Sequence, residues 1–111
     1  MKIKALTELE NYNCIVEGNL EDEVKDCYTG DLLSDVMGNA PTDSVLVTIQ
    51  AHKNTVAVAS LVGIKVVILC NGRECPEDMK AAAKEENVTL IGTIENQFSA
   101  SWKVAKLLNI K

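Results

Sequence analysis

Residues 45–70 read VLVTIQAHKNTVAVASLVGIKVVILC, and this stretch decides the fold class of the chain. Residues 45–49 and 66–70 are nearly continuous apolar runs, and 54–61 carries alanine and valine at helical density before Gly63. Continuous apolar strands are typical of a parallel sheet that is covered on both faces. A helix between two such strands forms the usual right-handed crossover. The stretch therefore predicts a strand–helix–strand unit with a parallel sheet.

The alternation continues toward the C-terminus. Pro76 followed by acidic residues predicts a helix that runs to about Glu86, because proline suits the first helical position and acids favour a helix N-terminus. A third apolar strand is expected at 88–91, before a last helix capped by Thr93 or Asn96. Apolar residues recur in that helix at three- and four-residue spacing, as Phe98, Trp102, Ala105 and Leu108.

The first 44 residues are less regular. The pattern predicts a short helix at 4–10, strands at 12–17 and 24–28, and a helix that Asp31 caps and that ends at Gly38-Asn39. No linker, repeat or low-complexity tract divides the chain. We therefore expect residues 1–111 to form a single α/β domain, with three layers and a largely parallel sheet.

The composition limits the classes of function. The net charge of −5 disfavours non-specific binding of nucleic acid, which depends on clustered lysine and arginine. The longest apolar run, 56–69, is interrupted by Ser60, Gly63 and Lys65 and is too short to span a membrane. The N-terminus has no apolar run typical of a secretory signal, so a cytoplasmic protein is expected.

Four cysteines are expected to be free thiols in that compartment: Cys14, Cys27, Cys70 and Cys75. No Cys-x-x-Cys pair occurs, so an iron–sulfur or zinc site would require the cysteines to converge from distant elements. We expect no cofactor, and an iron–sulfur or redox-thiol protein is the least favoured alternative. Cys75 stands next to a helix N-terminus, where a thiol can become reactive.

Polar residues follow the first two strands of the regular half. Ligands of open parallel sheets bind outside the carboxyl ends of the strands, and a helix N-terminus suits an anion. The residues predicted to bind a ligand there are Thr48, Gln50, His52, Asn54, Asn71, Gly72, Arg73 and Glu74. Asn71-Gly72 is also an ordinary turn dipeptide. His52 is the only histidine, and its position favours ligand contact over catalysis.

The sequence contains no phosphate-binding loop of the G-x-x-x-x-G-K-[ST] type, no dinucleotide fingerprint G-x-G-x-x-G, and neither G-x-S-x-G nor H-E-x-x-H. A chain without these motifs is not expected to carry a self-contained catalytic apparatus. We therefore predict no enzyme activity and assign no catalytic or metal-ligating residue.

Three segments resemble the stand-alone DRTGG-domain proteins of anaerobic bacteria: YTGDLLSDVM at 28–37, VTIQAHKNTVAVA at 47–59 and ILCNGRE at 68–74. The resemblance covers nearly the whole chain, although the string Asp-Arg-Thr-Gly-Gly is absent. It implies a fold like the N-terminal domain of HPr kinase/phosphorylase, whose phosphate-binding loop lies in a separate domain. It further implies a homodimer, a link to nucleotide-binding regulatory modules, and an association with iron hydrogenases.

Two functions from different classes follow. The first is a non-catalytic regulatory module that binds a small anion or nucleotide at the carboxyl edge of the sheet and serves anaerobic redox metabolism. The second is a protein-interaction subunit for hydrogenase or electron-transfer complexes, which would expose an apolar surface and bind no small molecule.

Overall fold

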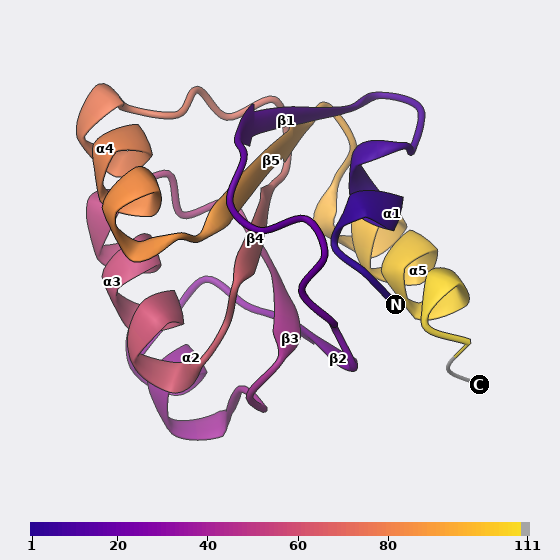
Figure 1. The fold of residues 1–111 in the computed structure, drawn as a ribbon, viewed down its shortest axis with the longest axis horizontal. Coiled ribbons are helices and arrows are strands. Elements are labelled where there is room, and N and C mark those ends of the chain that lie inside the picture. The colour runs from indigo at the N-terminus through magenta and orange to yellow at the C-terminus, as the bar shows by residue number, and fades with distance from the viewer. Residues whose placement is uncertain (110–111) are drawn as a thin grey trace.

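Five strands form one sheet in the order β1-β5-β4-β3-β2 in the computed structural model, which describes residues 1–109 (Figure 1). The strands are β1 (Tyr12–Val16), β2 (Asp26–Thr29), β3 (Ser44–Thr48), β4 (Val66–Leu69) and β5 (Thr89–Thr93). β2, β3, β4 and β5 are parallel, whereas β1 pairs with β5 in the antiparallel direction. The largely parallel α/β sheet expected from the sequence is confirmed.

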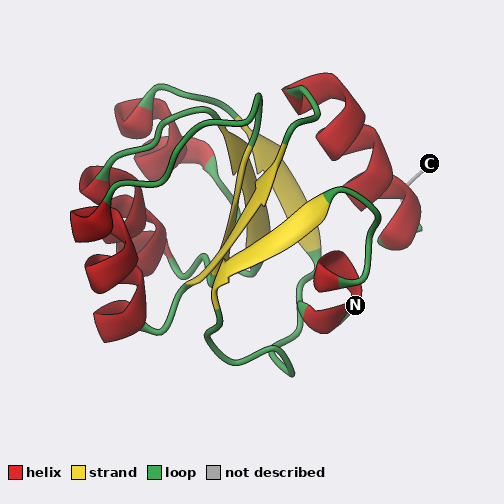
Figure 2. Cartoon of the chain, turned by 90° about the horizontal axis from the view of Figure 1, so that it is seen from above, coloured by secondary structure: helices red, strands yellow, loops and turns green. Residues whose placement is uncertain are grey.

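Helices cover both faces of the sheet (Figures 1 and 2). The helices are α1 (Lys4–Thr7), α2 (Leu33–Asn39), α3 (Lys53–Val62), α4 (Glu77–Glu86) and α5 (Gln97–Leu107). One core layer holds Leu46, Val67 and Leu90 of the strands against α2, α3 and α4. The opposite layer holds Val47 and Ile68 against α1 and α5. The sheet is therefore the middle of three layers, as predicted.

β3 and β4 are the most completely buried strands of the sheet. Every residue of both strands is fully buried, because alternate side chains of a central parallel strand point into opposite core layers. This explains why 45–49 and 66–70 are continuous apolar runs rather than alternating ones.

Left-handed residues end the two long helices on the α3–α4 face. Gly63 has φ 82° and closes α3, and Asn87 has φ 57° and closes α4. Both positions lie in the region that suits glycine and asparagine at a helix end. The end of α3 at Gly63 is where the sequence predicts it.

One local prediction was wrong. Asp31 does not cap α2, which begins at Leu33 and has no side-chain cap, because the Asp31 carboxylate bonds to other segments. In α5, Phe98 and Trp102 are exposed, and the buried residues are Ala100 and Val104. Small side chains let α5 lie close to the sheet and leave the large ones outside.

Candidate functional site

The four parallel strands end at the same edge of the sheet, which we call the carboxyl edge. Asp31 follows β2, Gln50 follows β3, Arg73 follows β4, and Gln97 opens the helix that follows β5. Parallel strands place these segments side by side, although they are up to 66 residues apart in the sequence. The carboxyl edge is where open α/β sheets bind their ligands.

The Asp31 carboxylate is the centre of the hydrogen bonding at this edge. Its Oδ1 accepts hydrogen bonds from the Thr48 hydroxyl at 2.9 Å, the Ile49 backbone N–H at 2.9 Å and the Gln97 side-chain amide at 3.0 Å. The Gln50 amide donates to the Asp31 backbone carbonyl at 2.8 Å. The end of β3 and the start of α5 are thereby tied to one carboxylate oxygen of the segment that follows β2. Among residues 1–109, no hydrogen bond reaches Oδ2.

The environment keeps Asp31 ionised. Partial burial alone would raise the pKa of Asp31, but the hydrogen bonds from Ile49, Thr48 and Gln97 outweigh it, and the positive charge of Arg73 acts in the same direction. The pKa of Asp31 is therefore below its ordinary value. The carboxyl edge presents a fixed carboxylate and, within its electrostatic reach, an exposed guanidinium.

Several of the predicted residues have structural roles of their own. The His52 side chain caps α3, since its Nδ1 accepts a hydrogen bond from the Asn54 backbone N–H at 3.0 Å. Asn71 and Gly72 form a left-handed turn, with φ 61° and 63°. Their N–H groups donate to Glu95 and Thr93 carbonyls at 2.8 and 2.9 Å. These backbone groups hold the β4 and β5 loops together.

The structure thus brings Thr48 and Gln50 into the Asp31 network and places Arg73 within its electrostatic reach. The exposed Asn54 side chain lies at the start of α3. The candidate site, as the structure arranges it, consists of Asp31, Thr48, Gln50, Arg73 and Gln97. We call these five residues the edge site.

Sequence reasoning missed Asp31 and Gln97 as site residues. Asp31 precedes a helix, and such an aspartate is read as an N-cap. The pairing of Gln97 with Asp31 requires α5 to cross back over β2, which local sequence does not reveal. Only the topology could have identified these two residues, because Asp31 and Gln97 each follow a strand of the same parallel sheet.

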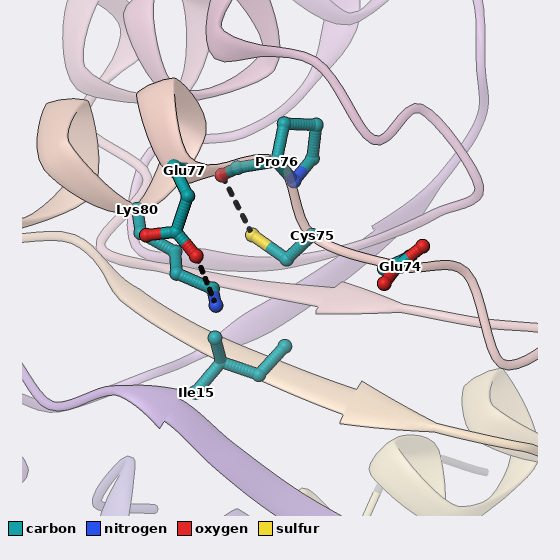
Figure 3. Close-up of a pocket in the computed structure, with 6 residues that line it drawn as sticks. All are labelled: Ile15, Glu74, Cys75, Pro76, Glu77 and Lys80. Carbon is teal, nitrogen blue, oxygen red and sulfur yellow. Dashed lines mark hydrogen bonds and ion pairs between the residues drawn. The ribbon is translucent and has the colours of Figure 1, made fainter.

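A cavity of about 550 Å³ lies at the start of α4 (Figure 3). It is lined by Ile15, Glu74, Cys75, Pro76, Glu77 and Lys80. Glu74 is the one predicted ligand residue that faces it. The Lys80 ammonium is 3.1 Å from Glu77, and the Cys75 thiol donates to the Pro76 carbonyl. The cavity is lined mainly by the first residues of α4 and the loop before it. Its lining shows no group of hydrogen-bond donors that point at one atom, as the donors around Asp31 do.

All four cysteines are free thiols, as the sequence predicts. Burial raises the pKa of the Cys75 thiol, and burial raises the pKa of Cys27 and of Cys70 to about 11. These three thiols are therefore protonated at neutral pH. Across residues 1–109, no group of three or more His, Cys, Asp or Glu side chains is placed to hold a metal ion.

A second carboxylate at the same edge makes stability depend on pH. Hydrogen bonds from Lys103 and Tyr12, at 2.5 and 2.7 Å, lower the pKa of Glu95. In the unfolded chain, Glu95 has its ordinary pKa of 4.5 and so binds a proton more readily than in the folded protein. The contribution of Glu95 to the free energy of unfolding is therefore complete above pH 4.5 and is lost as the pH falls through the lowered pKa.

We therefore expect the free energy of unfolding to fall as the pH is lowered below 4.5, and Glu95→Gln to reduce that dependence. Urea unfolding at several pH values measures it. Glu85→Gln, which changes an exposed glutamate of α4, is the matched control and should leave the slope as it is in the parent protein. Equal slopes for all three proteins would show that the Glu95 contacts contribute nothing in solution.

The fold defines a class before any comparison, namely small three-layer α/β domains built on a largely parallel sheet. No family model matches the sequence, and a search of curated proteins found no match. Among solved structures, the fold is similar to the CBS and DRTGG domains of the regulatory region of Clostridium perfringens pyrophosphatase, complexed with its activator diadenosine tetraphosphate.

The likeness has a TM-score of 0.63 at 14% sequence identity, and covers 90% of this chain and 46% of the pyrophosphatase chain. This chain therefore spans about half the length of that one. The comparison bears out the resemblance to a DRTGG domain at the level of the fold. The similar structure is a regulatory region of that pyrophosphatase. No helix within residues 1–109 is long and apolar enough to cross a membrane.

Proposed function

We propose that the chain is a non-catalytic regulatory module that binds a nucleotide at the edge site. The observation that carries the proposal is the Asp31 carboxylate, whose Oδ1 is held by donors from β3 and α5 while Oδ2 makes no hydrogen bond within residues 1–109. An acceptor fixed in this way needs little reorganisation when a ligand hydroxyl donates to it.

The charges at the edge favour a nucleotide over a bare anion. Asp31 is ionised and repels an anion that carries no donor of its own. A ribose hydroxyl donates to a carboxylate, as in other nucleotide-binding α/β folds, and the phosphate of the same ligand can pair with the exposed Arg73 guanidinium. A nucleotide offers both groups in one molecule.

The fold comparison supports the same ligand class. The pyrophosphatase region is a regulatory one, and the activator in its complex is a dinucleotide. At 14% identity the likeness concerns the fold, so the assignment of a nucleotide to this chain rests on the edge site. The absence of the phosphate-binding and nucleophile motifs from the sequence agrees with a module that binds without catalysing.

Binding should depend on Arg73. We expect Arg73→Ala to weaken nucleotide affinity about 10- to 100-fold, because a hydrogen bond to a charged group contributes about 1.5–3 kcal/mol. Calorimetry and thermal shift with adenine and guanine nucleotides, nucleosides and inorganic phosphate measure the change. Lys84→Ala removes the same charge from an exposed position on α4 and should bind like the parent protein.

No response to any nucleotide, or an equal loss of affinity in Arg73→Ala and Lys84→Ala, would reject the edge site as a nucleotide site. Phosphate alone binding as tightly as the nucleotides would instead favour a simple anion module, and would remove the role given to Asp31.

We also propose the location, the oligomeric state and the metabolic role that the sequence predicts. They are a cytoplasmic homodimer that serves iron-hydrogenase metabolism in anaerobes, with a protein-interaction subunit or an iron–sulfur protein as the alternatives. The homodimer and the hydrogenase link rest on the resemblance to DRTGG-domain proteins, and the cytoplasmic location rests on the N-terminal sequence. A pull-down from an anaerobic extract tests the hydrogenase link, and iron analysis of protein purified without oxygen tests the cluster.

A further inference from the structure

Two large apolar side chains that border the edge site are exposed to water. Leu32 directly follows Asp31 and is 67% exposed, and Phe98 directly follows Gln97 and is 81% exposed. Ligand sites usually combine a few polar groups with apolar and aromatic walls. The five residues of the edge site supply only the polar groups, so Leu32 and Phe98 are the candidates for the apolar part.

The rotation of α5 places Phe98 on the side of the helix that faces β2. Ala100 and Val104 point into the core, while Gln97 and Ser101 bond to residues at the end of β2 and just after it. Successive residues of an α-helix are about 100° apart. Going around the helix from the buried pair past Gln97 and Ser101, the next large side chain is therefore Phe98. It lies on the β2 flank of the edge site.

The groups along the carboxyl edge follow one another in the order of the parts of a nucleotide. Arg73 follows β4, Asp31 follows β2, and Phe98 lies on the β2 flank. Neighbouring strands are about 4.8 Å apart, so the loops after β4 and β2 are separated by roughly 10 Å. A cation, an ionised carboxylate and an aromatic ring in this order match a phosphate, a ribose and a base.

We propose that the base of the bound nucleotide stacks on the Phe98 ring, while Leu32 adds apolar surface near the ribose. The assignment rests on the proposed function and names the part of the site that contacts the base. Leu32 and Phe98 carry no side-chain hydrogen-bonding group, so this surface contacts the face of the base rather than its polar edge. Adenine and guanine nucleotides should therefore bind with similar affinity. Both should bind more tightly than pyrimidine nucleotides, whose single ring buries less area.

Trp102 is the other exposed aromatic side chain of α5 and serves as the comparison for Phe98. It comes four residues later, about 6 Å further along the helix from the carboxyl edge. The Lys106 ammonium lies 4.8 Å from the centre of its ring, so a cation already covers one face of the indole. Trp102 is 57% exposed, and its replacement removes an aromatic surface of the same helix without touching the edge site.

Phe98 is the only phenylalanine of the chain, so isotopic labelling of phenylalanine reports on this one ring. In a titration of the full chain, we expect ATP and GTP to shift the ring resonances, because a stacked base changes the magnetic environment of the ring. Ribose 5-phosphate, which has the sugar and a phosphate but no base, should leave them nearly in place. The amide resonances of the edge site, followed in the same titration, show whether each ligand is bound.

Calorimetry of variants gives the size of the effect. Phe98→Ala should weaken the binding of ATP by about 5- to 100-fold, the range that base stacking on an aromatic ring supplies. Phe98→Tyr and Trp102→Ala should both bind ATP like the parent protein, and circular dichroism checks that all three variants are folded.

The outcomes separate this assignment from the proposed function. ATP that shifts the amides of the edge site but not the Phe98 ring would overturn the stacking and leave the proposed function standing. The same holds if Phe98→Ala keeps its affinity for ATP, or loses no more than Trp102→Ala does. Neither ATP nor GTP binding at millimolar concentration would reject both.

Discussion

Replacing Asp31 by alanine is expected to lower the free energy of unfolding by about 2–4 kcal/mol and to abolish nucleotide binding. The substitution leaves the Thr48 hydroxyl and the Ile49 N–H without their acceptor, and each lost hydrogen bond to a charged group costs about 1.5–3 kcal/mol before water compensates. It also releases Gln97, so that α5 loses one of its ties to β2. Urea unfolding and calorimetry measure the two effects.

Asp31→Asn separates the structural role from the role in binding. Asparagine keeps one oxygen that can accept the bonds from Thr48, Ile49 and Gln97, and so should cost only about 1 kcal/mol. Its amide nitrogen replaces the second oxygen, so that an acceptor for a ligand hydroxyl becomes a donor. We expect nearly full stability with affinity reduced at least tenfold. An Asp31→Asn protein that binds nucleotide like the parent would show that the carboxylate does not contact the ligand.

Gly63→Ala is the second change with a large expected effect, a loss of about 2–3 kcal/mol in the free energy of unfolding. At φ 82° an alanine is in the left-handed region, which costs about 1–2 kcal/mol. Its Cβ would also lie 2.3 Å from the Thr42 hydroxyl oxygen, so Thr42 must change rotamer at about 1 kcal/mol. Chemical denaturation measures the loss.

Two controls divide this loss into its causes. In Gly38→Ala, the added methyl meets no atom within 4 Å and the residue lies inside α2, so we expect a gain of about 0.5–1 kcal/mol. A Thr42→Ala background removes the close oxygen, and there Gly63→Ala should retain only the cost of the left-handed backbone. An equal loss in both backgrounds would show that the contact with Thr42 is relieved without cost.

The regular half of the fold could be predicted from local pattern. Nearly continuous apolar runs occur where a strand is buried on both faces, as β3 and β4 are, and Gly63 ends α3 because few residues adopt its φ. The face of α5 could not be predicted in the same way. Phe98 and Trp102 have the spacing of a core face, but the smaller Ala100 and Val104 have it too and allow closer packing.

The edge site was predictable only in part. Thr48 and Gln50 were identified because they lie at the end of a buried strand, which is a local signal. Asp31 was assigned to a helix cap, and Gln97 had no local signal, since both act through partners that are distant in the sequence. A carboxylate that ties three segments together appears only when the strand order is known. The order β5-β4-β3-β2 is a property of the whole chain.

The central claim is that a nucleotide binds at the carboxyl edge and contacts Asp31 and Arg73. The most direct measurement is a titration of the isotopically labelled protein with nucleotide, followed through its backbone amide resonances. We predict that the shifted resonances cluster at Ile49, Gly72, Arg73 and Gln97, and that Asp31→Asn reduces the shifts. Shifts that cluster instead around Cys75 and Lys80, at the cavity beside α4, or no shifts at millimolar nucleotide, would contradict the account.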